Sequence, residues 1–361
     1  MPNPRPIRGR GAQSGALSTR FNLARCEADG DWLDQAEAID GAPSKLRTTV
    51  TEEHPKSILT FNASPDLGFD RSINAYRGCE HGCSYCFARP THAFHDLSPG
   101  LDFESRLFAK PNAASLLREA LARPGYAPRP IAMGTNTDPY QPIEARYRIT
   151  RQVLEICLET GHPAIITTKS DRVLSDLDLL REMAARNLVA VTLSVTSLDP
   201  KLSSTLEPRA AAPAKRIAAL AYLAQAGIPA HVSVAPVIPA ITDGEMEAII
   251  GAAAQAGAQS ASWILLRLPH EVAPIFREWL ATYYPERAGK VMAIIRSARG
   301  GRDNDPRFFS RMRPQGQWAQ LFRDRFRLAC KRQGIANDKI QLDCNRFKPP
   351  ANDRQLPLFP D

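Results

Sequence analysis

Three cysteines lie close together in the chain, with a spacing that is typical of a metal centre. Cys79, Cys83 and Cys86 fall within eight residues of the run RGCEHGCSYCF. Thiolates are ligands for zinc and for iron–sulfur clusters. The three side chains can meet at one centre only if the chain folds back, which Gly78 and Gly82 permit because glycine tolerates positive φ. Three protein ligands leave one coordination position open, so the spacing predicts a centre that binds a substrate or a cofactor.

Two other uses of these cysteines have to be weighed. A disulfide framework favours an even number of cysteines in a small secreted chain, whereas this chain has 361 residues and seven cysteines. A zinc knuckle is the second alternative, with His81, His92 or His95 as the fourth ligand. No second cysteine pair at zinc spacing follows, which favours the open centre over zinc.

Length and composition indicate a large globular protein. Hydrophobic residues make up 43% of the chain, enough for one large domain with extensions. The net charge of +8 suggests a polyanionic partner, and a merely basic surface is the alternative. The first 45 residues are rich in proline, arginine and glycine and contain no apolar run, which excludes a signal peptide or membrane span there. We expect a cytoplasmic protein without membrane contact, and reduced cysteines fit that compartment.

Alternating apolar and amphipathic segments predict the elements that carry the site. Expected strands are 71–76, 131–135, 164–168, 189–195, 230–236 and 262–267, and the expected helices are 111–123, 145–160, 172–187, 213–226, 243–256 and 271–283. Such alternation predicts a parallel sheet wrapped by helices. Six units are too few for a closed eight-stranded barrel, so we expect an α/β fold, a partial (β/α)6 TIM-type barrel open on one side.

Four segments are expected along the chain. They are an irregular N-terminal extension (1–65), the partial barrel (66–290), a basic helical C-terminal extension (291–348) and a C-terminal tail (349–361). Active sites of such barrels lie at the carboxyl ends of the strands. Polar residues gather after the expected strands, namely Thr137, Asp138, Lys169, Ser194, Glu207 and Arg209. Any one of them could instead be a helix cap or a turn residue, but three successive strands end in the same kind of group.

The cysteine spacing, with Tyr85 just before the last cysteine, resembles the signature loop of the radical S-adenosylmethionine (SAM) enzymes. The resemblance implies a 4Fe–4S cluster held by Cys79, Cys83 and Cys86, with SAM on the fourth iron. It also implies reductive cleavage of SAM to a 5′-deoxyadenosyl radical, fed by an electron donor such as flavodoxin or ferredoxin. Lys169 then suits the SAM carboxylate, because its ammonium is a compact cation.

Further motifs narrow the resemblance to the spore photoproduct lyase branch of that superfamily. They are TxTD (135–138), TK (168–169), EPRxxxPxKR (207–216) and VAPxxP (234–239). By this resemblance Tyr85, Thr137, Lys169 and Ser194 lie around SAM. Asp138, Glu207 and Arg209 are further expected cofactor contacts, because of their place after the strands. The longer runs SINAYRGCEHGCSYCFARPTH and TNTDPYQPIE resemble a bacterial subgroup described as DNA repair photolyase-like. The lyase branch has a hydrogen-donating cysteine where this chain has Thr135, so repair of the same lesion by the same route is not expected.

The other cysteines are candidates for the missing hydrogen donor. Cys157 and Cys330 lie in amphipathic helical segments and are expected in the core. Cys344 lies in the polar run QLDCNR, which could fold over the open barrel mouth, so Cys344 is the candidate donor; a merely structural thiol is the alternative. Cys26 precedes the barrel and has no predicted role.

Positive charge is concentrated near the C-terminus. Residues 296–332 hold 11 basic and three acidic residues, an excess equal to the net charge of the whole chain. Interleaved aromatic residues suit stacking on unpaired bases, so we expect nucleic acid, DNA before RNA, to contact Arg299, Arg302, Arg307, Arg311 and Arg313. The aromatic stripe Trp318, Phe322 and Phe326, spaced by four, is expected to pack on the barrel.

The tail adds one more candidate partner. Gln355, Leu356, Leu358 and Phe359 belong to QLPLF, which resembles the motif by which bacterial replication and repair proteins bind the DNA sliding clamp.

Taken together, these features predict a radical SAM enzyme that acts on nucleic acid and resembles a DNA repair lyase. The alternative is a nucleic-acid-binding protein with a structural or redox-sensing metal site and no turnover.

Overall fold

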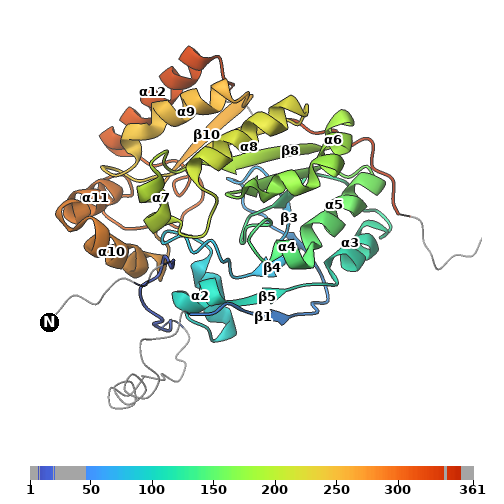
Figure 1. Cartoon of the computed structure of the whole chain (residues 1–361), viewed down its shortest axis with the longest axis horizontal. Coiled ribbons are helices and arrows are strands. Elements are labelled where there is room, and N and C mark those ends of the chain that lie inside the picture. Colours follow the sequence, from blue (N-terminus) through green and yellow to red (C-terminus); the bar gives the residue numbers. More distant parts are fainter. Residues whose placement is uncertain (1–6, 8, 19, 21–45, 337–339, 351–361) are drawn as a thin grey trace, which may run out of the picture.

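The computed structural model describes residues 7, 9–18, 20, 46–336 and 340–350. Its centre is a seven-stranded sheet with the order β10-β9-β8-β7-β6-β3-β2, in which only β2 and β3 pair antiparallel. The end strands β10 and β2 do not pair with each other, so the barrel is partial and open, as predicted (Figure 1). The strands are β2 (Leu59–Phe61), β3 (Arg71–Ile73), β6 (Ile131–Met133), β7 (Ala164–Thr168), β8 (Val189–Ser194), β9 (Ala230–Val237) and β10 (Ser260–Leu265).

All six predicted strands are present in this sheet. Most of their Val, Ile and Ala side chains are buried, as expected for a parallel sheet covered by helices. The predicted strand 71–76 is shorter, because the chain leaves β3 after Ile73 and starts a second sheet at Tyr76. Strand β2, which lies at the end of the sheet with Thr60 and Phe61 exposed, was not predicted.

Amphipathic helices cover the outer face of the sheet (Figure 1). They are α3 (Ala113–Leu121), α4 (Glu144–Tyr147), α5 (Ile149–Glu159), α6 (Leu177–Ala185), α8 (Pro213–Gln225) and α9 (Met246–Gln255). Cys157 of α5 is fully buried against the sheet and Cys330 is 1% exposed, which confirms both as core residues. Three segments form 3-10 helices, namely η1 (Arg89–His95), η2 (Asp171–Asp176) and η3 (Asp243–Glu245).

A small three-stranded sheet positions the cysteines. It has the order β1-β5-β4, from β1 (Thr49–Glu52), β5 (Arg106–Ala109) and β4 (Tyr76–Arg77). The cysteine loop, residues 78–88, leaves β4 directly, and the short helix α2 (Leu101–Ser105) leads back into β5. The described part of the N-terminal extension packs beside this region.

Three helices extend the barrel on the side of β10. They are α10 (Val272–Tyr283), α11 (Pro285–Ser297) and α12 (Gly316–Gln333), and a further short helix, α7 (Pro200–Leu206), packs against α10. The boundary expected at residue 290 falls inside α11. The rings of Phe322 and Phe326 lie 6.3 and 6.4 Å from that of Trp263 on β10, so these two members of the aromatic stripe pack on the barrel, as predicted. Trp318, the third member, is 39% exposed and contacts Phe322.

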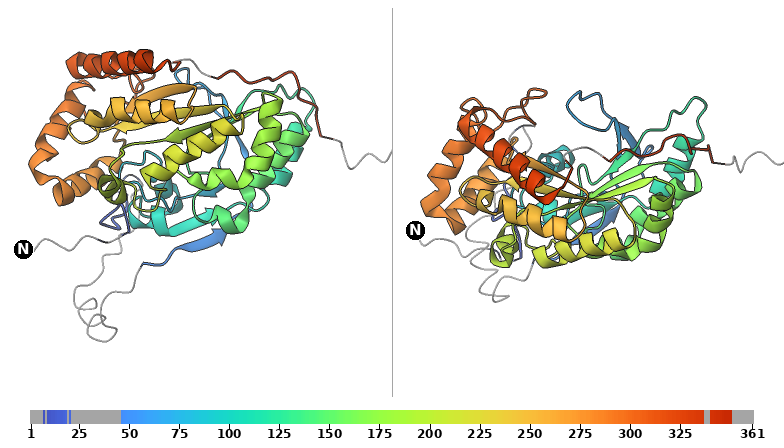
Figure 2. Two further views of the ribbon diagram at one scale, coloured as in Figure 1. Left: turned by 45° about the horizontal axis from the view of Figure 1, so that its top comes forward. Right: turned by 90° about the horizontal axis from the view of Figure 1, so that it is seen from above.

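The chain after α12 returns along the amino ends of the strands (Figure 2). The Asp343 amide donates to the carbonyl of Asn187, which precedes β8, and the Lys348 amide donates to that of Thr160, which precedes β7. No helix among the described residues is long and apolar enough to cross a membrane.

Candidate functional site

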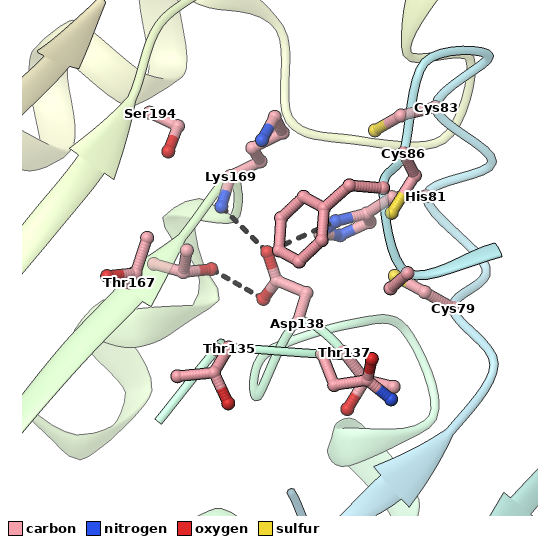
Figure 3. A pocket seen from close by; sticks show the side chains of 15 residues that line it. Cys79, His81, Cys83, Cys86, Thr135, Thr137, Asp138, Thr167, Lys169 and Ser194 are labelled. Carbon is pink, nitrogen blue, oxygen red and sulfur yellow. Dashed lines mark hydrogen bonds and ion pairs between the residues drawn. The ribbon is translucent and has the colours of Figure 1, made fainter. Parts of the chain in front are cut away.

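The cysteine loop turns its three thiols toward one cavity (Figure 3). Gly78 and Gly82 have φ values of 71° and 66°, which confirms the positive φ expected of them. Cys79 and Cys83 are buried and Cys86 is half-buried. Burial raises the pKa of the Cys83 thiol to about 12, so a metal that binds there has to displace protons.

The opposite wall of the cavity is formed by the carboxyl ends of β6, β7 and β8. Thr137 and Asp138 follow β6, Lys169 follows β7, and Ser194 ends β8. The predicted residues at three strand ends therefore lie in the same cavity as the cysteines. Thr135 also lines it, at the position where the lyase branch has its cysteine. The complete lining is Cys79, His81, Cys83, Cys86, Phe87, Ala88, Gly134, Thr135, Asn136, Thr137, Asp138, Thr167, Thr168, Lys169 and Ser194.

Asp138 joins the cysteine loop to the strand ends. One carboxylate oxygen accepts from the Thr168 hydroxyl at 2.6 Å, and the other accepts from the Lys169 amide at 2.8 Å and lies 3.3 Å from Nδ1 of His81. Burial opposes its charge, but His81 and these hydrogen bonds lower the pKa of Asp138 to about 2. Both oxygens are engaged, so Asp138 positions its neighbours and has little capacity left for the cofactor contact expected of it.

Lys169 presents its ammonium group to the cavity. Among the described residues none forms a hydrogen bond or an ion pair with its Nζ, which lies 5.8 Å from the centroid of the Tyr85 ring. Burial opposes the charge of Lys169, yet the acidic groups of Cys83 and Glu207 raise its pKa above the ordinary value. The side chain is therefore a cation with room for an anionic ligand.

Tyr85 and Glu207 lie behind the cavity wall and are not part of the lining described above. The Tyr85 hydroxyl donates to the Glu207 carboxylate and lies 3.2 Å from Oγ1 of Thr196. Glu207 forms an ion pair with Arg216, and neither side chain is more than 1% exposed. These residues support the cavity wall from behind. The sequence did not indicate that they would lie behind the wall and not in it.

Arg216 is a site residue that the sequence analysis did not single out. Its guanidinium pairs with Glu207 and donates to the carbonyl of Ser194 at 3.0 Å, so it holds the end of β8 in place. Arg216 is the last residue of the EPRxxxPxKR run, which was the available signal. Arg209 of the same run is exposed instead and pairs with Glu80 at 3.1 Å, away from the cavity.

Two further residues lie elsewhere than the sequence predicted. Cys344 does not fold over the barrel mouth, because residues 340–350 are bonded to the amino ends of the strands, opposite the cavity. Arg299 is 3% exposed and donates to the carbonyls of Leu265 and Leu266, so it supports the fold and is unavailable to a phosphate.

The histidines bear on the zinc alternative. His81 is engaged with Asp138, and His92 lies 2.9 Å from the carbonyl oxygen of Arg106. In the described part of the chain no three His, Cys, Asp or Glu side chains converge on a position for one ion. An iron–sulfur cluster is larger than a single zinc ion, so its thiolate ligands stand further apart. Three thiols that line one cavity therefore fit a cluster better than a single zinc ion.

The loop between α11 and α12 carries the exposed basic residues. Arg302, Arg307 and Arg313 are exposed, and Arg307 also pairs with Asp305 at 2.8 Å. Arg311 forms an ion pair with Asp66 of the β2–β3 connection, whose side chain is 2% exposed. Since β2 and β10 are the two ends of the sheet, this ion pair joins the loop that follows α11 on the β10 side to the β2 end of the sheet. Phe308 and Phe309 are 54% and 50% exposed on the same loop.

Comparison with known proteins agrees with this geometry. Residues 73–253 match the family model described as the radical SAM superfamily, and the chain belongs to that superfamily. Membership implies a 4Fe–4S cluster and SAM as cofactors, as predicted. An uncharacterised protein of Mycobacterium tuberculosis is 38% identical over 232 residues, covering 64% of this chain and 68% of that protein. One of Methanocaldococcus jannaschii is 31% identical over 179 residues, covering 50% and 64%.

Solved structures of spore photoproduct lyase share the fold. A single-residue variant of that lyase superposes with a TM-score of 0.59 and 15% identity, covering 87% of this chain and 86% of the lyase. A variant with bound AdoMet and dinucleoside spore photoproduct gives 0.51 and 15%, covering 74% of each chain. The likeness confirms the partial-barrel fold that the motifs predicted.

Proposed function

We propose that this protein is a radical SAM enzyme in which Cys79, Cys83 and Cys86 hold the cluster. The observation that carries this assignment is the single cavity shared by these thiols and the polar ends of β6, β7 and β8. When bound, the cluster supplies the electron that cleaves SAM to methionine and a 5′-deoxyadenosyl radical. Lys169 contacts the SAM carboxylate, and Thr137 and Ser194 offer hydroxyl groups to its amino or ribose groups.

The residues behind the wall keep these contacts in place. Asp138 fixes the Lys169 backbone through the amide, and Arg216 fixes Ser194 through its carbonyl. Tyr85 forms the surface beside which the Lys169 side chain extends. In this proposal Asp138, Tyr85 and Glu207 are positioning residues, whereas Lys169 and Ser194 touch the cofactor.

The substrate we propose is a nucleic acid, with DNA favoured. Three exposed arginines and two exposed phenylalanines share one loop at the open side of the barrel, where a large substrate can approach. Arginine suits phosphate contacts, and phenylalanine faces suit stacking on unpaired bases.

The proposed reaction resembles that of the lyase in its radical chemistry but not in its hydrogen donor. Thr135 carries a hydroxyl whose O–H bond is a poor hydrogen-atom donor, so the substrate radical is quenched by another group.

The cytoplasm suits this proposal, because an oxygen-labile cluster needs a reducing compartment and an electron donor such as flavodoxin or ferredoxin. Electron paramagnetic resonance tests the site. After anaerobic reconstitution and reduction, we expect a 4Fe–4S signal that shifts on addition of SAM and is lost in Cys83→Ala but kept in Cys344→Ala. A signal that SAM leaves unchanged would contradict SAM binding and favour the non-enzymatic alternative, a nucleic-acid-binding protein with a redox-sensing centre.

A further inference from the structure

The outer side of the cysteine loop is covered by a segment far away in the sequence. Residues 9–18, here called the N-terminal strap, lie more than 50 residues before the start of the family match at residue 73. The backbone amides of Gly11 and Ala12 donate to the two carboxylate oxygens of Glu104 at 3.1 and 2.7 Å. The buried Arg10 side chain donates to the Glu104 carbonyl at 2.8 Å. The strap is therefore attached to α2 through one fully buried glutamate.

Glu104 also links the strap to the cysteine loop, through Arg89. It forms an ion pair with Arg89 at 2.6 Å, and both side chains are fully buried. Arg89 donates to the carbonyls of Cys83 and Gly82 at 2.9 and 3.0 Å. A buried carboxylate whose charge is matched by one guanidinium and two amides is costly to disturb, because any lost partner leaves a buried group unsatisfied.

The strap also touches the cysteine loop directly. A Cβ atom added to Gly11 would lie 1.6 Å from the carbonyl oxygen of Gly82, which is backbone and cannot rotate away. Gly82 is the residue just before Cys83 and has positive φ. Any side chain at position 11 therefore displaces either the strap or the backbone that carries Cys83. Gly15 of the same strap is exposed and has no atom within 4 Å of such a Cβ.

We infer that the strap, Glu104 and Arg89 form a second layer of the cluster site, which holds the backbone of the cysteine loop in the shape that brings three thiols to one cavity. The inference rests on the proposed function for the identity of the bound group, but the layer itself is a property of this chain. All of these residues act through the loop, so they are positioning residues and not catalytic ones. The strap belongs to the same functional unit as the barrel despite its distance along the sequence.

Thiol labelling of the metal-free full-length protein tests the layer without any cofactor. Cys79 and Cys83 are buried, so an alkylating reagent reaches them only when the loop opens. We expect Gly11→Ala to raise the labelling rate of Cys83 roughly tenfold, in line with the loss of one or two buried hydrogen bonds. Gly15→Ala is the matched control and should label like the unaltered protein. Cys157 in α5 is the internal control for the whole fold.

A second variant keeps the test decisive where Gly11→Ala fails to fold. Glu104→Gln retains the shape but removes the charge that faces Arg89, and the same rise at Cys83 with no rise at Cys157 is expected. Equal labelling of Cys83 in Gly11→Ala and Gly15→Ala would overturn the inference. A rise at Cys157 as large as that at Cys83 in both variants would also overturn it, because the strap would then support the whole fold and not the loop.

Iron retention links the layer to the proposed function. In reconstituted protein, Gly11→Ala should lose iron to a ferrous chelator about tenfold faster than Gly15→Ala, the same factor as in labelling. If the unaltered protein takes up no cluster, the proposed function fails while the labelling result still decides the inference. If a cluster forms but both variants release iron at the same rate, the inference fails and the proposed function stands.

Discussion

The ammonium of Lys169 lies 5.8 Å from the centre of the Tyr85 ring, between the cysteine loop and the end of β7. Tyr85 precedes Cys86, and Lys169 follows Thr168, so the contact joins two segments about 80 residues apart. An ammonium group over an aromatic face keeps its charge, and the side that faces away from the ring can still bind an anionic ligand. This pair is the point at which the cysteine loop meets the cationic part of the cavity.

The Lys169 contact predicts a loss of SAM affinity on substitution. Lys169→Met removes the cation without emptying the space, and SAM should bind at least about tenfold more weakly, as expected for loss of a charge-assisted contact. Iron content should not change. Isothermal titration of reconstituted protein gives the affinity, and Lys290→Met, on the exposed side of α11, is the control. Unaltered affinity in Lys169→Met would remove Lys169 from the site.

The exposed arginines predict a salt-dependent interaction with nucleic acid. Replacing Arg302, Arg307 and Arg313 together by Gln should weaken binding of single-stranded DNA and lower the slope of log K against log salt by up to about two units, at roughly 0.7 per contact. Basal SAM cleavage should not change. The matched control replaces three arginines on the helical face, Arg123, Arg181 and Arg186.

The slope is measured from binding isotherms at several salt concentrations. The structure changes which arginines are worth testing, because Arg299 is buried and the side chain of Arg311, which pairs with Asp66, is only 18% exposed. Arg307 pairs with Asp305 but keeps 74% of its side chain exposed. Two outcomes would refute the predicted surface. One is equal slopes in the loop variant and in the unaltered protein, and the other is an equal loss in the control variant.

Glu144 predicts a pH dependence of stability. Burial raises its pKa from 4.5 to about 7, and the Tyr76 hydroxyl donates to it. The native state then holds a proton that the unfolded state has lost, so stability is full below pH 4.5 and falls as the pH rises toward 7. The contribution amounts to about 3 kcal/mol. Urea unfolding of metal-free protein between these limits should show the fall, and Glu144→Gln should lack that component; identical pH profiles would contradict it.

The sequence was a good guide to the fold and to the cavity, and a poor guide to what lies behind the cavity. Strands β7 to β10 have five to eight residues each, and their Val, Ile and Leu residues make the strand pattern visible in the sequence. Parallel strands necessarily bring Thr137, Lys169 and Ser194 to one edge. Whether the side chain of a polar residue lines the cavity or lies behind its wall depends on how the side chains pack in the folded protein. Arg209 and Arg216 have the same side chain in the same motif, yet Arg209 is exposed and Arg216 is fully buried.

Long-range contacts were also out of reach. Nothing near residue 344 indicates that its segment bonds to Asn187 and Thr160 at the far end of the barrel. The sequence also does not indicate the close approach of Gly11 to Gly82, since a glycine required by such a contact looks like any other glycine in an N-terminal segment rich in glycine and proline.

The tail prediction concerns residues 351–361, which lie outside the described residues. A peptide of residues 350–361 should bind the bacterial DNA sliding clamp with modest affinity, because two apolar side chains offset the cost of ordering a short segment. Leu358→Ala combined with Phe359→Ala should abolish binding, while Asp353→Ala should leave it unchanged. Fluorescence anisotropy measures both. Absence of binding at high micromolar peptide would refute the docking prediction.

Release of 5′-deoxyadenosine is the most direct test of the central claim. Reconstituted protein is incubated anaerobically with SAM and dithionite, alone and with damaged, undamaged or single-stranded DNA or tRNA, and the nucleoside is measured by liquid chromatography. We expect release by the unaltered protein and by Cys344→Ala, and none by the Ala variants of Cys79, Cys83 or Cys86. A colourless protein that binds zinc and releases no 5′-deoxyadenosine under any of these conditions would contradict the account.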